Sequence, residues 1–210
     1  MGIYEQIADE VIKGQADVVK DLVNQALSES ISAEDILNNG LVAGMNVVSK
    51  KFKSNEFFIP EVLVSARAMT AGLDILNPLL AEANVKARGK VVIGTVKGDL
   101  HDIGKNIVGM MLQGAGYEIV DLGADVPKEK FIEFTQKEDA NMVGMSALLT
   151  TTMIYMKEII QGLKDAGLRD KVKVIIGGAP VTQAYANQIE ADGYAPDAAS
   201  AIDLAKDLLD

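Results

Sequence analysis

The chain has 210 residues, of which 49% are hydrophobic and 24% charged, and its formal net charge is −10. This length allows one large domain or two small ones, each with a buried core. The absence of cysteine excludes disulfides, thiolate metal sites and a cysteine nucleophile, and the acidic balance argues against a nucleic-acid partner.

No run of about 18 apolar residues appears, which argues against a membrane-spanning helix. The first residues, MGIYEQIADEVIKGQ, lack the basic flank and the apolar stretch of a secretory signal. We therefore expect a soluble, cytoplasmic protein with no membrane partner.

Residues 2–82 have a helical period throughout. Apolar residues three or four positions apart predict one helix around residues 3–11 and a second around residues 18–26. Ser32 suits the start of a third helix, which runs toward Phe52.

A fourth helix begins near Pro60, which suits a first helical turn, and its apolar face extends over residues 62–76. Asn77 and Pro78 then disturb the pattern. Four helices with short connections predict a small antiparallel bundle.

The polar segment NVKARGK, residues 84–90, predicts a linker, because short strands alternate with helical stretches from there to the end. This alternation predicts an α/β fold with a doubly wound, five-stranded parallel sheet in the flavodoxin-like order 2-1-3-4-5. The expected domains are therefore a four-helix bundle at residues 1–86 and an α/β domain at residues 87–210. The predicted strands cover residues 90–96, 117–121, 142–146 and 172–176, with a short one near Tyr194.

Three loops follow strands one, three and four at the same edge of the sheet: KGDLHDIGKN (97–106), SALLTTT (146–152) and GGAP (177–180). Ligands of such sheets bind at this edge. His101, the only histidine, is followed by Asp102 and preceded by Asp99, which can accept a hydrogen bond from Nδ1 and so fix the tautomer.

A solvated loop histidine is the ordinary alternative. One histidine cannot build a protein-only zinc site, so a metal here must arrive already coordinated, as in a haem or a corrinoid. The hydroxyl run after strand three suits helix capping, and Gly177 with Gly178 suits a turn. Taken together, the loops also describe a slot walled by small residues and hydroxyls, with a histidine at its mouth.

These residues resemble the B12-binding proteins, whose pattern is D-x-H-x-x-G, then S-x-L, then G-G. The segment FFIPEVLVSARAM, residues 57–69, resembles the four-helix cap domain of methionine synthase. No barrel domain for substrate or folate is present, which points to the small corrinoid proteins of methanol, methylamine, glycine betaine or methoxylated-aromatic methyltransferase systems. The resemblance covers nearly the whole chain, and the residues that match the pattern are Asp99, His101, Gly104, Ser146, Leu148, Gly177 and Gly178.

The resemblance implies a cobamide bound base-off, with His101 as the lower axial ligand of cobalt. Asp99 would tune the histidine, and Thr152 stands where methionine synthase has the serine of a His-Asp-Ser relay. The bundle at residues 1–86 would be a cap over the methyl face of the cofactor, which residues 87–210 would bind. The cofactor-binding residues implied are Asp99, His101, Asp102, Ile103, Gly104, Ser146, Leu148, Thr150, Thr152, Gly177 and Gly178.

By the same resemblance, the protein is a non-catalytic methyl carrier, in which Co(I) accepts a methyl group and methyl-Co(III) donates it. Its partners are a substrate:corrinoid methyltransferase, a second methyltransferase and a reductive activase. Two alternatives share the three loop patterns: the cobalamin subunit of an adenosylcobalamin-dependent mutase and a B12-dependent sensor. The cap-like helices argue against the mutase subunit, and the lack of a basic region argues against a DNA-binding sensor.

Overall fold

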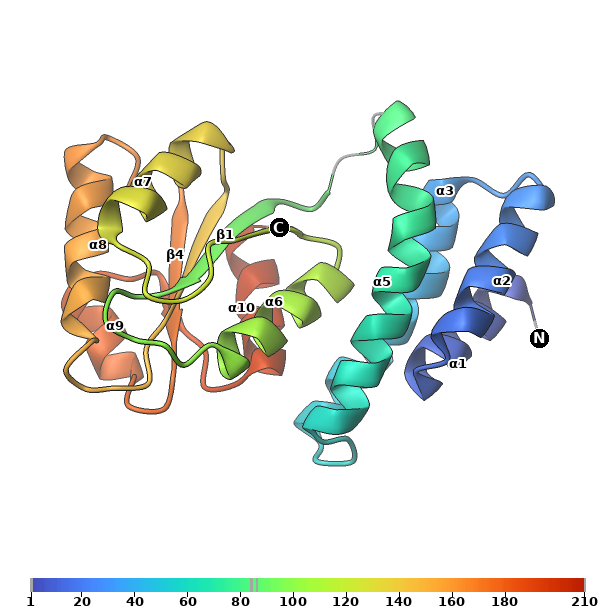
Figure 1. Cartoon of the computed structure of the whole chain (residues 1–210), viewed down its shortest axis with the longest axis horizontal. Coiled ribbons are helices and arrows are strands. Elements are labelled where there is room, and N and C mark those ends of the chain that lie inside the picture. The colour runs from blue at the N-terminus through green and yellow to red at the C-terminus, as the bar shows by residue number, and fades with distance from the viewer. Residues whose placement is uncertain (1, 84, 86, 210) are drawn as a thin grey trace. The chain divides into compact units, whose positions relative to one another are not determined.

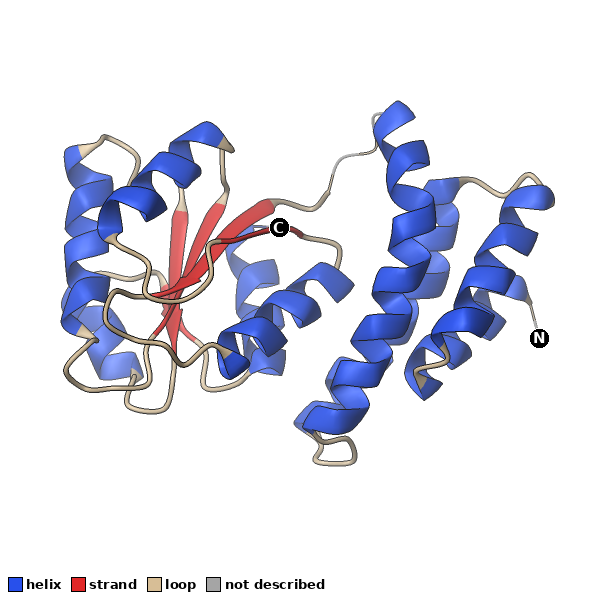
Figure 2. Ribbon diagram, viewed as in Figure 1, coloured by secondary structure: helices blue, strands red, loops and turns tan. Residues whose placement is uncertain are grey.

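The structure is a computed structural model that describes residues 2–83, 85 and 87–209. The chain divides into two compact units. The first comprises Met1–Ala87 with Gln113–Gly116, and the second comprises Arg88–Leu112 with Tyr117–Asp210. Helices form the described part of the first unit, whereas the second combines helices with a sheet (Figure 2).

The predicted bundle is present in the first unit. Its helices bury apolar side chains that recur with a helical period, and Ile7, Val23, Leu41 and Leu76 are fully buried among them. Each such side chain contributes roughly 1.5–3 kcal/mol when it leaves water. The elements are α1 (Ile3–Lys13), α2 (Ala16–Ser28), α3 (Ala33–Asp35), η1 (Ile36–Val42), α4 (Ala43–Lys53) and α5 (Ile59–Glu82).

The third helix of the bundle begins where the sequence predicts. The Ser32 side chain accepts a hydrogen bond from the Asp35 N–H at 3.0 Å, which is N-cap geometry. The helical run continues through α3, η1 and α4, and its middle part, η1, is a π-helix that the sequence did not predict. Gly40 and Gly44 pack closely on α1 there: a Cβ at Gly40 would lie 2.9 Å from Ile7 Cγ2.

Asn77 and Pro78, which disturb the apolar pattern of the fourth helix, lie inside α5, which continues to Glu82. Proline removes one backbone donor, which leaves the carbonyl four residues earlier, at Asp74, without its helical partner. Asp74 and Pro78 are both exposed, so water can solvate that carbonyl. Burial of Leu80 on the inner face holds the last turns in place.

In the described part of the second unit, parallel strands form a five-stranded sheet in the order β2-β1-β3-β4-β5, and the prediction of this order is confirmed. Helices α7, α8 and α9 lie on one face, and α6 and α10 lie on the other (Figure 1). The strands are β1 (Lys90–Thr95), β2 (Glu118–Asp121), β3 (Met142–Ser146), β4 (Lys173–Gly177) and β5 (Gly193–Tyr194). The helices are α6 (Ile103–Gly114), α7 (Lys128–Lys137), α8 (Ile154–Asp165), α9 (Gln183–Ile189) and α10 (Ala198–Leu209).

The strand bounds differ from the prediction by one residue at several ends. Strand β1 ends at Thr95, and Val96 instead makes a single parallel bridge to Val126. The central strands are buried on both faces, so their sequences are apolar runs rather than alternating patterns. Of the predicted linker at residues 84–90, Asn84 and Lys86 lie outside the described residues, and Lys90 already belongs to β1.

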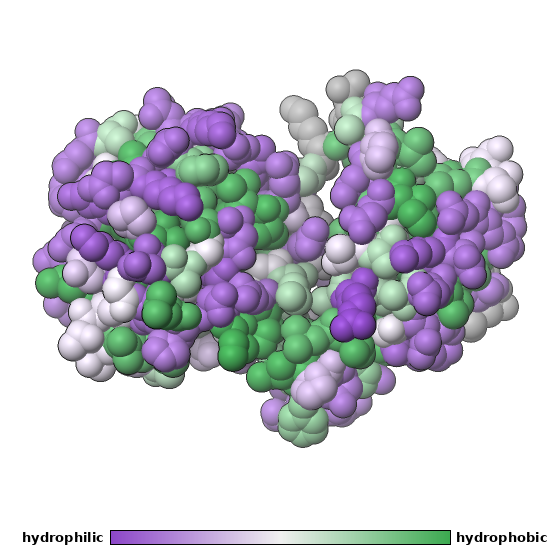
Figure 3. Space-filling view, viewed as in Figure 1, coloured by the Kyte–Doolittle hydropathy of each residue, from purple (hydrophilic) through white to green (hydrophobic). Residues whose placement is uncertain are grey.

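On the face shown in Figure 3, hydrophilic areas alternate with hydrophobic ones. Several large apolar side chains are exposed, among them Leu100, Ile103 and Ile154 in the second unit. Among the residues described, no helix has both the length and the apolar character needed to cross a membrane.

Candidate functional site

The histidine lies in the loop between β1 and α6, at the carboxyl edge of the sheet. The loop turns at Gly98, whose φ of 78° lies in the left-handed region that glycine adopts without strain. The Asp99 N–H donates to the Val96 carbonyl at 3.1 Å. The buried Thr95 hydroxyl donates to the His101 carbonyl at 3.2 Å. These bonds hold the main chain on both sides of the Asp99 side chain.

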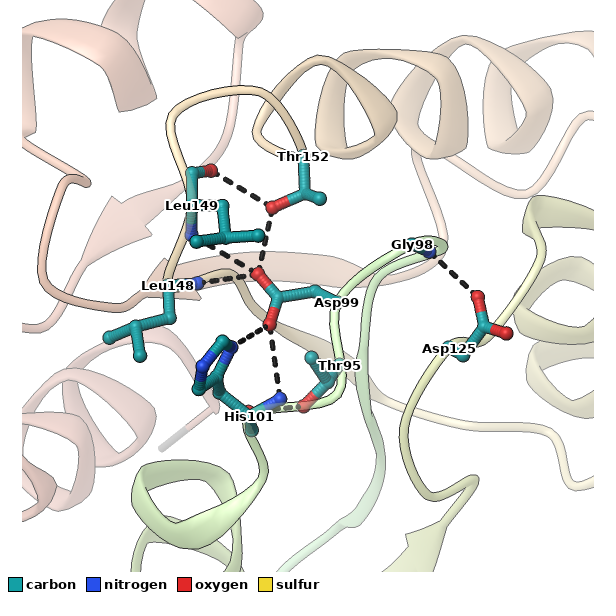
Figure 4. Close-up of polar contacts among 8 residues, drawn as sticks. All are labelled: Thr95, Gly98, Asp99, His101, Asp125, Leu148, Leu149 and Thr152. Atoms are coloured by element: carbon teal, nitrogen blue, oxygen red, sulfur yellow. Dashed lines mark hydrogen bonds and ion pairs between the residues drawn. The ribbon is translucent and has the colours of Figure 1, made fainter.

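The Asp99 carboxylate is fully buried and accepts hydrogen bonds from two loops (Figure 4). Its Oδ1 accepts a bond from the His101 N–H at 3.1 Å and lies 2.8 Å from His101 Nδ1. Its Oδ2 accepts bonds from the N–H groups of Leu148, at 2.7 Å, and Leu149, at 3.2 Å. The Thr152 hydroxyl also donates to Oδ2, at 2.7 Å. One carboxylate therefore joins the loops that follow β1 and β3.

The Thr152 hydroxyl has two acceptors within reach. Its Oγ1 lies 2.7 Å from Asp99 Oδ2 and 2.9 Å from the Leu149 carbonyl. A hydroxyl has one hydrogen, and an ionised carboxylate is the stronger acceptor, so the bond goes to Asp99. The methyl group that distinguishes threonine from serine does not prevent this contact.

The environment of Asp99 determines which histidine nitrogen carries hydrogen. Burial raises the pKa of the Asp99 carboxyl, but the hydrogen bonds from Thr152, the Leu148 N–H and His101 outweigh burial and hold that pKa well below its usual range. The carboxylate is therefore ionised near neutral pH and only accepts hydrogen bonds. His101 Nδ1 must then be the donor, and in the neutral ring the lone pair is on Nε2. The side chain of His101 is 52% exposed, so its ring is accessible to a ligand.

Asp102, Ile103 and Gly104 lie at the start of α6. The Asp102 carbonyl accepts a bond from the Asn106 N–H at 2.8 Å, and its carboxylate accepts one from the Asn106 side chain at 3.2 Å. Helix α6 begins at Ile103, directly after Asp102. Ile103 is 73% exposed, and a Cβ at Gly104 would meet no described atom within 4 Å. The surface beside the histidine loop is thus open and partly apolar.

Ser146, Gly177 and Gly178 lie where β3 and β4 end side by side. Ser146 pairs with Gly177 in the parallel register, and the Gly177 carbonyl accepts a bond from the Ala147 N–H at 3.2 Å. Gly178 has a φ of 123°, and a Cβ there would lie 1.9 Å from the Ala147 carbonyl oxygen, so only glycine fits. The two remaining predicted residues are exposed in the loop after β3: Leu148 and Thr150.

The structure joins only part of the predicted set directly. Asp99, His101, Leu148 and Thr152 share one hydrogen-bond network, whereas the other predicted residues lie along the same edge of the sheet. Sequence reasoning missed residues that act through the main chain or support it. These are Thr95, Leu149 and Asp125.

Within residues 2–83, 85 and 87–209, no three histidine or carboxylate side chains gather closely enough to hold a metal ion.

Two family models, each described as a B12 binding domain, match this chain, one at residues 89–203 and the other at residues 3–77. The chain is 47% identical over 208 residues to the dimethylamine corrinoid protein of Methanosarcina barkeri, covering 99% of this chain and 97% of that protein. It is 44% identical over 212 residues to a corrinoid protein of Desulfitobacterium hafniense, covering 100% and 98%. The chain belongs to the B12-binding corrinoid proteins.

This corrinoid protein also resembles a solved structure of the methanol:cobalamin methyltransferase complex of Methanosarcina barkeri. The TM-score is 0.90 at 35% identity, and the match covers 99% of this chain and 79% of that one. The cofactor of a B12-binding corrinoid protein is a cobamide.

The site fits a cobamide on three observations. His101 offers one imidazole nitrogen beside a buried carboxylate, which is the donor arrangement that a metal-binding histidine uses. Gly177 and Gly178 are partly exposed where β4 ends at the carboxyl edge of the sheet, and they carry no side chain that would keep a long polar tail away. A broad, partly apolar macrocycle also needs apolar contacts, and large apolar side chains are exposed in the loops after β1 and β3 and at the first residue of α6: Leu100, Leu148, Leu149 and Ile103.

We predict that Asp99→Asn lowers the free energy of unfolding at pH 7 by roughly 1–3 kcal/mol, because an amide nitrogen then faces buried donors. The folded-state pKa of Asp99 is lowered, so its stabilisation is complete above the ordinary carboxyl pKa of about 4 and is lost as the pH falls through the folded value. The difference in the free energy of unfolding between the wild type and the variant should therefore become smaller below about pH 4. Urea denaturation at pH 7 and at acidic pH measures it.

The matched control is Asp102→Asn, in the same loop, whose carboxylate accepts a bond from Asn106 at 3.2 Å. This variant should change stability much less at pH 7. An equal free energy of unfolding for the wild type and Asp99→Asn at pH 7 would contradict the stabilising role of the Asp99 hydrogen bonds.

Proposed function

We propose that this corrinoid protein carries a methyl group between two partner enzymes and catalyses neither transfer by itself. The observation that supports this most is the exposed His101 ring, which the buried Asp99 carboxylate holds with hydrogen on Nδ1. The cobalt of a bound cobamide supplies the chemistry, taking a methyl group from a donor and giving it to an acceptor. The residues of the chain bind and orient the cofactor and control a proton at the histidine.

In this proposal the cobamide binds base-off, and His101 Nε2 replaces its own lower base as the axial ligand. Asp102, Ile103 and Gly104 border the corrin, where the surface beside the histidine is open. The displaced nucleotide tail enters a slot at the ends of β3 and β4. The residues proposed to line it are Ser146, Leu148, Thr150, Gly177 and Gly178.

Asp99 and Thr152 tune the axial bond. The ionised carboxylate accepts the Nδ1 hydrogen and so makes Nε2 a better electron donor. Because the buried carboxylate holds the Nδ1 hydrogen, Nε2 is the ring atom that would hold the metal. Thr152 keeps Asp99 ionised through its hydrogen bond to Oδ2.

We assign the cap role to residues 1–86 and cobamide binding to residues 87–210, in line with the two separate family matches. A substrate:corrinoid methyltransferase is the first proposed partner, since the similar solved structure is a methyltransferase complex. A second methyltransferase would take the methyl group to the acceptor, and a reductive activase would restore the reduced cobalt. A methylated amine is the first donor to test, because the similar corrinoid proteins include dimethylamine ones.

The axial ligand can be identified because the chain has one histidine. We expect cob(II)alamin bound to the natural-abundance protein to give an EPR spectrum with a triplet splitting from one axial nitrogen. Protein labelled with ¹⁵N at histidine should give a doublet, because ¹⁵N has spin one-half. The lower base of cobalamin itself carries only ¹⁴N, so the doublet is specific for His101.

His101→Ala should lose the label-dependent splitting, whereas the control Thr151→Ala, at an exposed residue of the loop after β3, should keep it. A triplet in the labelled wild-type protein would rule out histidine ligation.

The carrier role has its own test. Reduced cobamide-loaded protein, mixed with a cell extract and a panel of methylated amines and methanol, should gain the absorbance of methylcobamide with one class of donor. The methyl group should then pass to an acceptor when the second methyltransferase is supplied. Failure with every donor, in an extract that methylates a known corrinoid protein, would contradict the role.

A further inference from the structure

The loop after β2 runs alongside the histidine loop. The Thr95 N–H donates to the Gly123 carbonyl at 2.9 Å, and the Val126 N–H donates to the Thr95 carbonyl at 3.0 Å. Val96 and Val126 also pair as a parallel bridge. The segment between β2 and α7 therefore continues the edge of the sheet and supports the chain just before it turns into the histidine loop.

Asp125 is the residue of this segment that reaches the turn itself. Its Oδ1 accepts a bond from the Gly98 N–H at 2.7 Å, and its own N–H donates to the Asp99 carbonyl at 3.0 Å. Asp125 thus contacts main-chain groups on both sides of the Asp99 Cα. In Figure 4 it approaches the loop from the side opposite to Leu148 and Thr152.

Two different loops therefore hold Asp99. The loop after β3 binds its side chain, through Leu148, Leu149 and Thr152, whereas Asp125 binds its main chain. The direction of a short side chain follows from its main chain, so a carboxylate can aim at the His101 ring only if both are fixed. The backbone of Asp125 itself has a φ of 54°, a conformation that aspartate tolerates better than most residues with a side chain.

We propose that Asp125 is a positioning residue for the histidine ligand: it fixes the Gly98 turn so that Asp99 orients His101 toward the cobalt. This inference rests on the proposed histidine ligation, and Asp125 acts through Gly98 and Asp99 without contact to the cofactor. Its removal should leave the fold intact, because Asp125 is exposed, and should change the axial bond.

Two substitutions separate the carboxylate from the backbone conformation. Asp125→Gly keeps a positive φ without strain but removes the acceptor for the Gly98 N–H. Asp125→Asn keeps a side-chain oxygen that can accept that bond and also tolerates the left-handed region. The matched control is Asp139→Gly: Asp139 is an exposed aspartate with a φ of 48°, just before β3 at the opposite edge of the sheet.

The experiment measures cob(II)alamin binding and the share of the EPR signal that carries the ¹⁵N-histidine splitting, with thermal unfolding of each variant in parallel. For Asp125→Gly we expect a smaller histidine-coupled share and a Kd roughly three- to tenfold higher, as for the loss of one partly exposed charged hydrogen bond. Asp125→Asn should restore most of both values, and Asp139→Gly should match the wild type.

One result would overturn the positioning role alone: Asp125→Gly has the same EPR spectrum and Kd as the wild type. This conclusion requires that the wild type shows the histidine splitting and that His101→Ala lacks it. Absence of the splitting in the wild type would overturn the ligation, and the positioning role with it. An equal loss in Asp125→Gly and Asp139→Gly would also overturn the role, since it would mark a general effect of glycine on stability.

Discussion

The site depends on one buried carboxylate. Asp99 lies at the turn between β1 and α6, has no exposed surface, and accepts bonds from the histidine and from the loop after β3. An ionised group is costly to bury unless its oxygens are hydrogen-bonded, so these donors and the carboxylate require one another. Because these donors hold the Asp99 carboxylate in place, it accepts the Nδ1 hydrogen of His101, and Nε2 remains for a metal.

The sheet explains why these groups meet at all. Strand β1 lies between β2 and β3, so the loops that follow these strands emerge side by side at one edge. The loop after β3 supplies Thr152 and N–H groups, and the loop after β2 supplies Asp125. A lone histidine on an exposed loop becomes a directed ligand because parallel topology brings loops distant in sequence together.

The sequence was sufficient for the strand order and for the Asp99–His101 contact, because apolar runs and close spacing in one loop are local signals. It was insufficient where tertiary packing decides the outcome. Pro78 stays inside α5 because the inner face of the helix remains buried beyond it, and Asp125 reaches Gly98 only through strand adjacency. Main-chain donors such as the Leu149 N–H have no sequence signature at all.

The central claim is that Asp99 holds His101 with hydrogen on Nδ1 and keeps Nε2 free for cobalt. NMR of the ¹⁵N-histidine protein tests it directly, because the single histidine gives one pair of ring nitrogen signals. At a pH where imidazole is neutral, the account predicts a protonated Nδ1 and an unprotonated Nε2, and only Nε2 should shift strongly when a diamagnetic Co(III) cobalamin is added. Hydrogen on Nε2, or a metal-induced shift at Nδ1, would contradict it.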